Sequence, residues 1–168
     1  GEPPRARFGP VRRSTRRSRT NSTAGRFWSA AGDGHVVGYL ERTMTINIHA
    51  AWIGFLLGCV AGAVPGLFFH GEHWLGGYAS WRRRMMRLAH ISFFGLGVLN
   101  LAFALTVRAL EIESGRLVPA LLLIAGASTM PVVCYLSAWK SPFRHLFFVP
   151  AGSVTVGVAL FTWRVLAT

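Results

Sequence analysis

The first long apolar stretch carries a glycine at every fourth position, in the run Gly54-Phe55-Leu56-Leu57-Gly58-Cys59-Val60-Ala61-Gly62-Ala63-Val64-Pro65-Gly66. In water, four glycines in one helix would destabilise it by roughly 4 kcal/mol relative to alanine. In a bilayer, the same row removes side chains from one stripe and lets a second helix backbone come close. We therefore expect a membrane-spanning helix here, with a helix-packing face formed by Gly54, Gly58, Gly62 and Gly66.

Three more apolar runs follow, and each is near the ~20 residues that cross a bilayer. The four expected spans cover about residues 46–69, 86–107, 117–139 and 143–166. Only 14% of the residues are charged, against about 25% in a typical soluble domain. The turns between the last three spans are short, which favours antiparallel neighbours. The predicted fold is an all-α, up-down four-helix bundle embedded in a membrane, over residues 44–168.

Residues 1–43 differ in composition from the rest of the chain. They hold nine of its 18 basic residues, together with many Ser, Thr, Gly and Pro, and they show no apolar periodicity. This composition predicts a tail that is disordered unless a partner binds it. An arginine- and serine-rich, acid-poor start is also typical of an organelle transit peptide. A further alternative is that translation starts at Met44, so the presence of the tail in the mature protein stays open.

The net charge of +12 would suggest nucleic-acid binding in a soluble protein. Here most basic residues outside the tail flank apolar runs, so membrane topology accounts for them and no nucleic-acid partner is expected. The positive-inside rule places loops 70–85 and 140–144 on the cytoplasmic or matrix side of a bacterial or organelle inner membrane. We call this side the basic end. Four arginines near this end are expected to fix the topology: Arg82, Arg83, Arg84 and Arg87. Alternatively, they would contact anionic lipid or dock an acidic subunit.

Four of the six histidines gather near the basic end. His90 lies about one turn inside the second span, whereas His70, His73 and His145 lie at the ends of spans. Neutral imidazole is a usual axial ligand of b-type haem, and helix bundles build cofactor sites from facing helices. The sequence therefore predicts a cofactor site at His90, with His70 or His145 facing it. Packing or an interfacial polar role is the alternative for these side chains.

No catalytic residue is predicted. The sequence contains no nucleophile, phosphate-binding or dinucleotide motif. Two histidines in His70-Gly71-Glu72-His73 are too few for a zinc site. No Asp or Glu lies within a span, which argues against a pump built on buried carboxylates. Asn100, deep in the second span, is expected to form an interhelical hydrogen bond.

These observations predict a non-catalytic accessory subunit of a membrane electron-transfer complex. Its partners would be the lipid bilayer and other membrane subunits, with no soluble substrate. The histidines at the basic end would ligate haem b or contact a pigment or quinone. Two alternatives remain open: a structural or assembly protein without cofactor, and an oligomeric carrier or channel for small solutes.

Overall fold

The computed structural model describes the backbone of residues 23–68 and 70–167, and side chains from Met44 onward within these ranges. The chain divides into two units, Gly1–Val36 and Val37–Thr168. Of the first unit, only the helical backbone from Thr23 is described. Residues 1–22 of the proposed tail lie outside the described residues, whereas the backbone of residues 23–43 belongs to α1, and the division of the chain at residue 43 stays a prediction.

The described residues fold into helices and contain no strand. The long helices are α1 (Thr23–Phe68), α2 (Trp81–Ala109), α3 (Leu117–Trp139) and α4 (Phe148–Leu166), with short 3-10 helices η1 (Trp74–Gly76) and η2 (Ser141–Phe147). Four segments are long and apolar enough to cross a membrane: Met44–Phe68, Trp81–Ala109, Leu117–Trp139 and Ser141–Leu166. The four-helix membrane fold class is thus confirmed.

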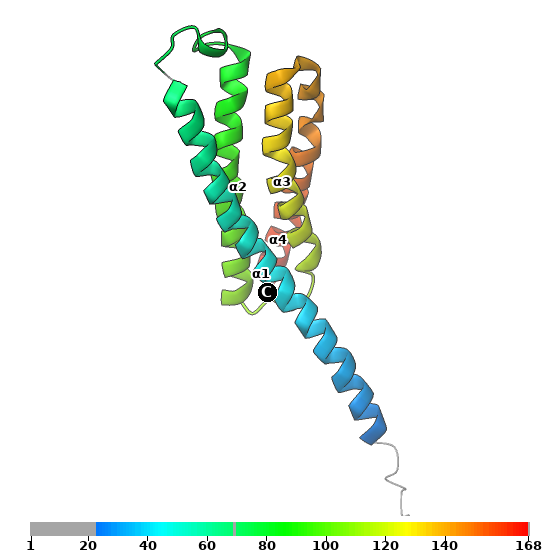
Figure 1. Cartoon of the computed structure of the whole chain (residues 1–168). Coiled ribbons are helices and arrows are strands. Elements are labelled where there is room, and N and C mark those ends of the chain that lie inside the picture. Colours follow the sequence, from blue (N-terminus) through cyan, green and yellow to red (C-terminus); the bar gives the residue numbers. More distant parts are fainter. Residues whose placement is uncertain (1–22, 69, 168) are drawn as a thin grey trace, which may run out of the picture. The chain divides into compact units, whose positions relative to one another are not determined.

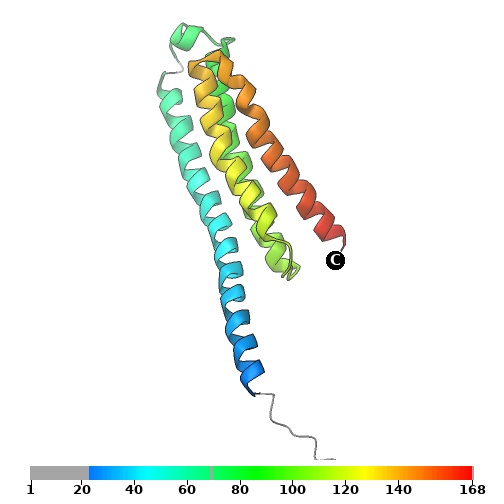
Figure 2. The same cartoon turned by 90° about the vertical axis from the view of Figure 1, so that its right-hand side faces the viewer.

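Successive spans run in opposite directions in the second unit. Figures 1 and 2 show the α1–α2 loop and η2 at one end of the bundle, which is the basic end, and the α2–α3 turn at the opposite end. That turn is tight because Glu111 and Gly115 both have positive φ, of 49° and 72°. The positive φ favours glycine at position 115, and a Cβ there would also displace the guanidinium group of Arg164.

Helix α2 starts five residues earlier than the sequence suggested. Ser80 caps it, because its hydroxyl oxygen accepts a hydrogen bond from the backbone N–H of Arg83 at 3.3 Å. The arginine triplet therefore lies in the first turn of the helix rather than in a loop. A cation in the first helical turn is opposed by the helix dipole, so these arginines need other partners or solvent.

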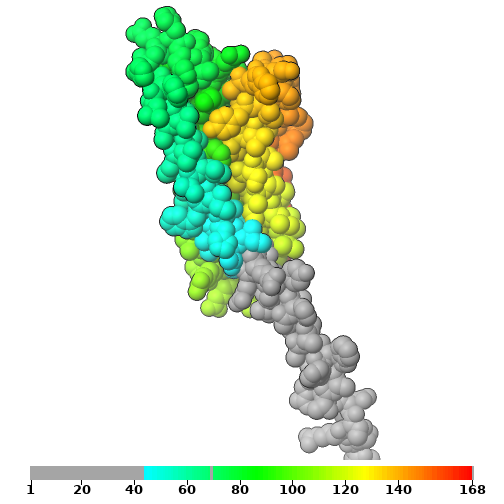
Figure 3. Space-filling view, viewed as in Figure 1, coloured from blue at the N-terminus to red at the C-terminus, as the bar shows by residue number. Residues whose placement is uncertain are grey.

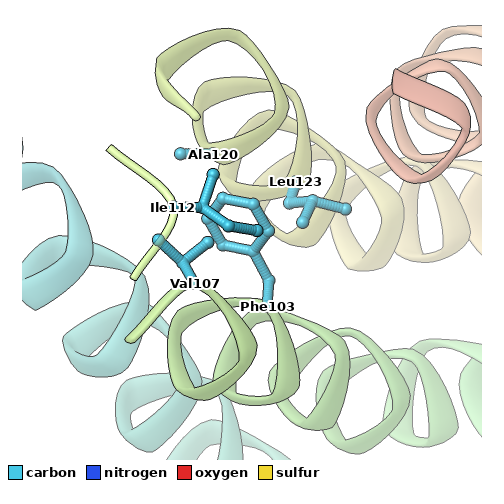
Figure 4. Close-up of a cluster of buried hydrophobic side chains, with 5 residues drawn as sticks. All are labelled: Phe103, Val107, Ile112, Ala120 and Leu123. Atoms are coloured by element: carbon cyan, nitrogen blue, oxygen red, sulfur yellow. The ribbon is translucent and has the colours of Figure 1, made fainter. Parts of the chain in front are cut away.

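The apolar core lies near the opposite end, where α2 and α3 meet (Figure 4). Phe103 and Val107 of α2 pack there against Ile112 of the turn and against Ala120 and Leu123 of α3. Helix α4 closes this core, since the ring of Phe161 meets that of Phe103 edge to face at 4.6 Å. Met44 of α1 also packs against the cluster. All four helices therefore contribute to the core at this end.

The outer helices bury less surface than the inner ones. Within their apolar windows, 11% of residues are buried in α1 and in α4, against 39% in α3. Figure 3 shows the Met44 end of α1, in cyan, lying against α3, in yellow-green. Several large side chains face outward on the outer helices, which suits contact with lipid or with another membrane protein.

Candidate functional site

His90 is held in a defined orientation between α1 and α2. Its side chain is half-buried on α2, and its Nδ1 atom lies 2.9 Å from the carbonyl oxygen of Gly58 on α1. A carbonyl oxygen only accepts hydrogen bonds, so Nδ1 carries the proton and donates. In neutral imidazole this leaves a lone pair on Nε2. The structure records no partner for Nε2 among the residues it describes.

Aromatic rings of α2 fill the space that the glycine row leaves open. A Cβ at Gly62 would stand 2.9 Å from Nδ1 of His90 and closer still to Cε1. A Cβ at Gly58 would lie 2.7 Å from the ring of Phe94. The rings of His90 and Phe94 meet edge to face at 5.3 Å. The stripe thus faces a helix of the same chain over these two positions.

The ends of the row differ from its centre. At Gly54, a Cβ would lie 3.2 Å from the backbone oxygen of Phe93, so the two backbones come close there. At Gly66, a Cβ would meet nothing within 4 Å. The last glycine is therefore not needed for contact with α2 within the described chain, and the space beside it is open. That the four glycines together form the face on which the helices assemble stays a prediction.

A pocket of about 230 Å³ begins at this open space. It lies between the last turns of α1 and the first turns of α2, and His90 forms part of its wall. The surface that it presents is almost entirely carbon. Its lining consists of Ala61, Gly62, Pro65, Gly66, Trp74, Arg83, Met86, Arg87 and His90.

Arg83 is a buried arginine in the lining of the pocket. Its residue surface is only 4% exposed. Nε donates to the carbonyl oxygen of Trp74 at 2.7 Å, a second guanidinium nitrogen donates to that of Gly71, and the group lies 5.4 Å from the Trp74 ring centroid. Hydrogen bonds from a charged donor contribute about 1.5–3 kcal/mol each. The buried guanidinium therefore ties the α1–α2 loop to α2.

The other arginines that were expected to face lipid differ in their exposure to solvent. Arg82 and Arg84 are exposed, as a contact with headgroups requires. Arg87 is half-buried, and its guanidinium lies 4.6 Å from the ring centroid of Tyr78. The sequence could not indicate which arginine of the triplet is buried, because a helix turns its successive residues to different sides.

The other predicted ligand histidines do not meet His90 at the pocket. His70 and His145 are exposed at the basic end, and neither lines the cavity. Within the described residues, no group of three or more His, Cys, Asp or Glu side chains could hold a metal ion. A cofactor role for these two histidines stays a prediction.

A buried asparagine pair joins three helices in the other half of the bundle. Asn47 Nδ2 donates to Asn100 Oδ1 at 2.8 Å, and Asn100 Nδ2 donates to the carbonyl oxygens of Leu96 and Leu123 at 2.9 and 3.3 Å. Both side chains are fully buried. The sequence indicated the role of Asn100 but not its partner. The signal was present, since Asn47 and Asn100 lie at similar depth in two antiparallel spans.

Comparisons of this chain with protein-family models, curated proteins and solved structures found no match. Its function is therefore inferred from the geometry of the bundle and the pocket. The pocket offers one oriented imidazole, two arginines and an indole among backbone glycines and carbon-lined walls.

Proposed function

We propose that this protein is a non-catalytic, multi-pass membrane subunit of an electron-transfer complex that holds a quinone-class ring beside His90. The four apolar helices support the membrane setting. The observation that carries the proposal is the orientation of His90. A hydrogen bond to Gly58 fixes the imidazole at the wall of a pocket that is otherwise apolar. Pockets of this kind bind apolar ligands and orient them by one or two polar groups.

A quinone-class ring suits this pocket better than haem. The volume of about 230 Å³ lies below the ~300–1,000 Å³ of pockets for drug-sized ligands, and a porphyrin is a large flat ligand. Among the residues whose side chains are described, His90 is also the only histidine that lines the cavity. A single ring with its isoprenoid or alkyl tail directed into lipid requires less space and no second axial ligand.

A structural role without cofactor is the second candidate. It is favoured by the asparagine pair, which holds α1, α2 and α3 together without reference to any ligand. The outer faces of α1 and α4 would then serve as contact surfaces for other subunits. Among their most exposed large side chains are Leu67 on α1 and Phe148 and Trp163 on α4, each more than 70% exposed.

Analysis of the ligand that copurifies separates these candidates. The full chain is purified in mild detergent from quinone- and haem-sufficient membranes, and extracted lipids are analysed by chromatography and mass spectrometry. Near-stoichiometric quinone or quinol that is lost in His90→Ala supports the proposal. The matched control is His49→Ala, because His49 is exposed on α1 away from the pocket.

Two results would contradict the quinone assignment. A Soret band in the reduced-minus-oxidised spectrum that vanishes in His90→Ala would instead identify haem. A preparation that carries neither quinone nor chromophore, and that binds no added quinone or quinol, would leave the structural role.

A further inference from the structure

We infer that the α1–α2 pocket selects the hydroxyl-bearing, reduced form of its ring ligand, a quinol, over the quinone. This inference rests on the proposed function, since it assumes that a ring binds beside His90. It goes further by naming the redox form that the pocket prefers. The inference depends on the contact between His90 and the carbonyl oxygen of Gly58, which fixes the nitrogen that carries the imidazole proton.

The hydrogen bond determines what His90 offers to a ligand. Gly58 O accepts, so Nδ1 is the protonated nitrogen of the neutral ring, and Nε2 is an acceptor. Nε2 belongs to the part of the ring that faces the missing side chain of Gly62, and both residues line the pocket. A ligand hydroxyl can donate to Nε2. A quinone carbonyl cannot, because two acceptors face each other.

The other polar groups of the lining do not reverse this preference. The guanidinium of Arg83 donates to loop carbonyl groups, and that of Arg87 lies over Tyr78. Trp74 contributes an indole ring whose N–H is a donor. A hydroxyl both donates and accepts, so it can bond to Nε2 of His90 as well as to a donor of the lining, whereas a carbonyl can bond only to a donor.

The open glycine provides the space for the ring. Gly66 has nothing within 4 Å of the place where its Cβ would be, yet it lines the pocket. A flat ring can therefore lie against the bare backbone between Gly62 and Gly66. A large side chain at position 66 would occupy this space without entering the α1–α2 contact.

The inference is tested by comparing three ligands of nearly the same ring size. The full chain in detergent is titrated under argon, by calorimetry, with tetramethylhydroquinone, tetramethylbenzoquinone and the dimethyl ether of the hydroquinone. One net hydrogen bond corresponds to an affinity difference of about tenfold or somewhat less. We expect the hydroquinone to bind more tightly than the other two by about this factor. This comparison uses the unaltered protein and does not depend on the folding of any variant.

Three variants assign the effect to the pocket. His90→Leu should remove the preference for the hydroquinone, whereas His49→Leu should retain it. Gly66→Leu should abolish binding of all three ligands while the protein stays monodisperse in gel filtration. Nitrogen chemical shifts of labelled histidine provide a readout independent of ligand, and they should show one histidine with Nδ1 protonated and Nε2 bare.

The outcomes separate the inference from the proposed function. Equal affinities for the three ligands, or tighter binding of the quinone, would overturn the inference and leave the ring site standing. Binding of none of them would overturn the proposed function as well. Histidine shifts showing His90 protonated on Nε2 alone would overturn the inference by themselves.

Discussion

Alanine substitutions at two positions of the glycine row test how α1 meets α2. Gly62 and Gly66 lie one step apart in the same row and both line the pocket. Only Gly62 faces a ring: a Cβ placed there would overlap His90, whereas a Cβ placed at Gly66 would meet open space. We expect Gly62→Ala to destabilise the protein and Gly66→Ala to leave it unchanged or slightly more stable.

The expected difference follows from three contributions. Overpacking against a ring costs about 1–3 kcal/mol, and loss of the His90–Gly58 hydrogen bond costs about 0.5–1.5 kcal/mol. Replacing glycine by alanine inside a helix recovers about 0.8–1 kcal/mol. Gly62→Ala should therefore lower the free energy of unfolding by roughly 0.5–4 kcal/mol, whereas Gly66→Ala retains only the gain from helix propensity.

Unfolding in mixed micelles, with SDS as denaturant and circular dichroism as the signal, measures both variants against the unaltered chain. The difference between the two alanine variants is the decisive quantity, because effects of detergent and of helix propensity are common to both. Equal stability of the two variants would refute the contact between His90 and Gly62. A larger loss of stability in Gly66→Ala than in Gly62→Ala would mean that α1 packs on α2 through another face.

Three further tests concern contacts away from the α1–α2 glycine contact. In a double-mutant cycle in the same assay, Asn47→Leu and Asn100→Leu should couple by about 0.6 kcal/mol and at most about 1.7 kcal/mol, and additivity within ~0.3 kcal/mol would show that the pair does not form. Arg83→Met should lower stability by about 3–6 kcal/mol through the loss of its two charged hydrogen bonds, whereas the exposed Arg84→Met should change it by less than about 0.5 kcal/mol; similar losses would mean that Arg83 is not buried. Ser153→Ala removes a 2.7 Å hydrogen bond from α4 to α3 and should cost about 1 kcal/mol in the same measurement; no change would show that this bond contributes nothing to the α3–α4 contact.

The fold class could be predicted because membrane thickness sets the length of an apolar span. Each of the four runs is long enough to cross hydrocarbon, and short turns leave few ways to connect them. The start of α2 was harder to predict, because three consecutive arginines are more typical of a loop than of an apolar span. Only the serine cap and the burial of Arg83 explain why the helix begins at Trp81.

The candidate site could be predicted only in part. His90 was identifiable as an ionisable group inside a span. Its partner could not be identified, because every residue has a backbone carbonyl group and the sequence does not show which one accepts. Any of several helix faces could also have packed on the glycine row. His70 and His145 share the level of the basic end with His90, but equal depth does not bring residues on different helices together. Pairing Asn47 with Asn100 would have required knowing that their helix faces meet.

The contacts of Arg83 also bear on the order in which the chain folds. The two loop carbonyl groups that accept its hydrogen bonds lie only nine and 12 positions earlier in the sequence, so these two bonds form within the α1–α2 segment. Contacts between near neighbours in sequence form early. We therefore expect the hairpin of α1 and α2 to form before α3 and α4 pack against it.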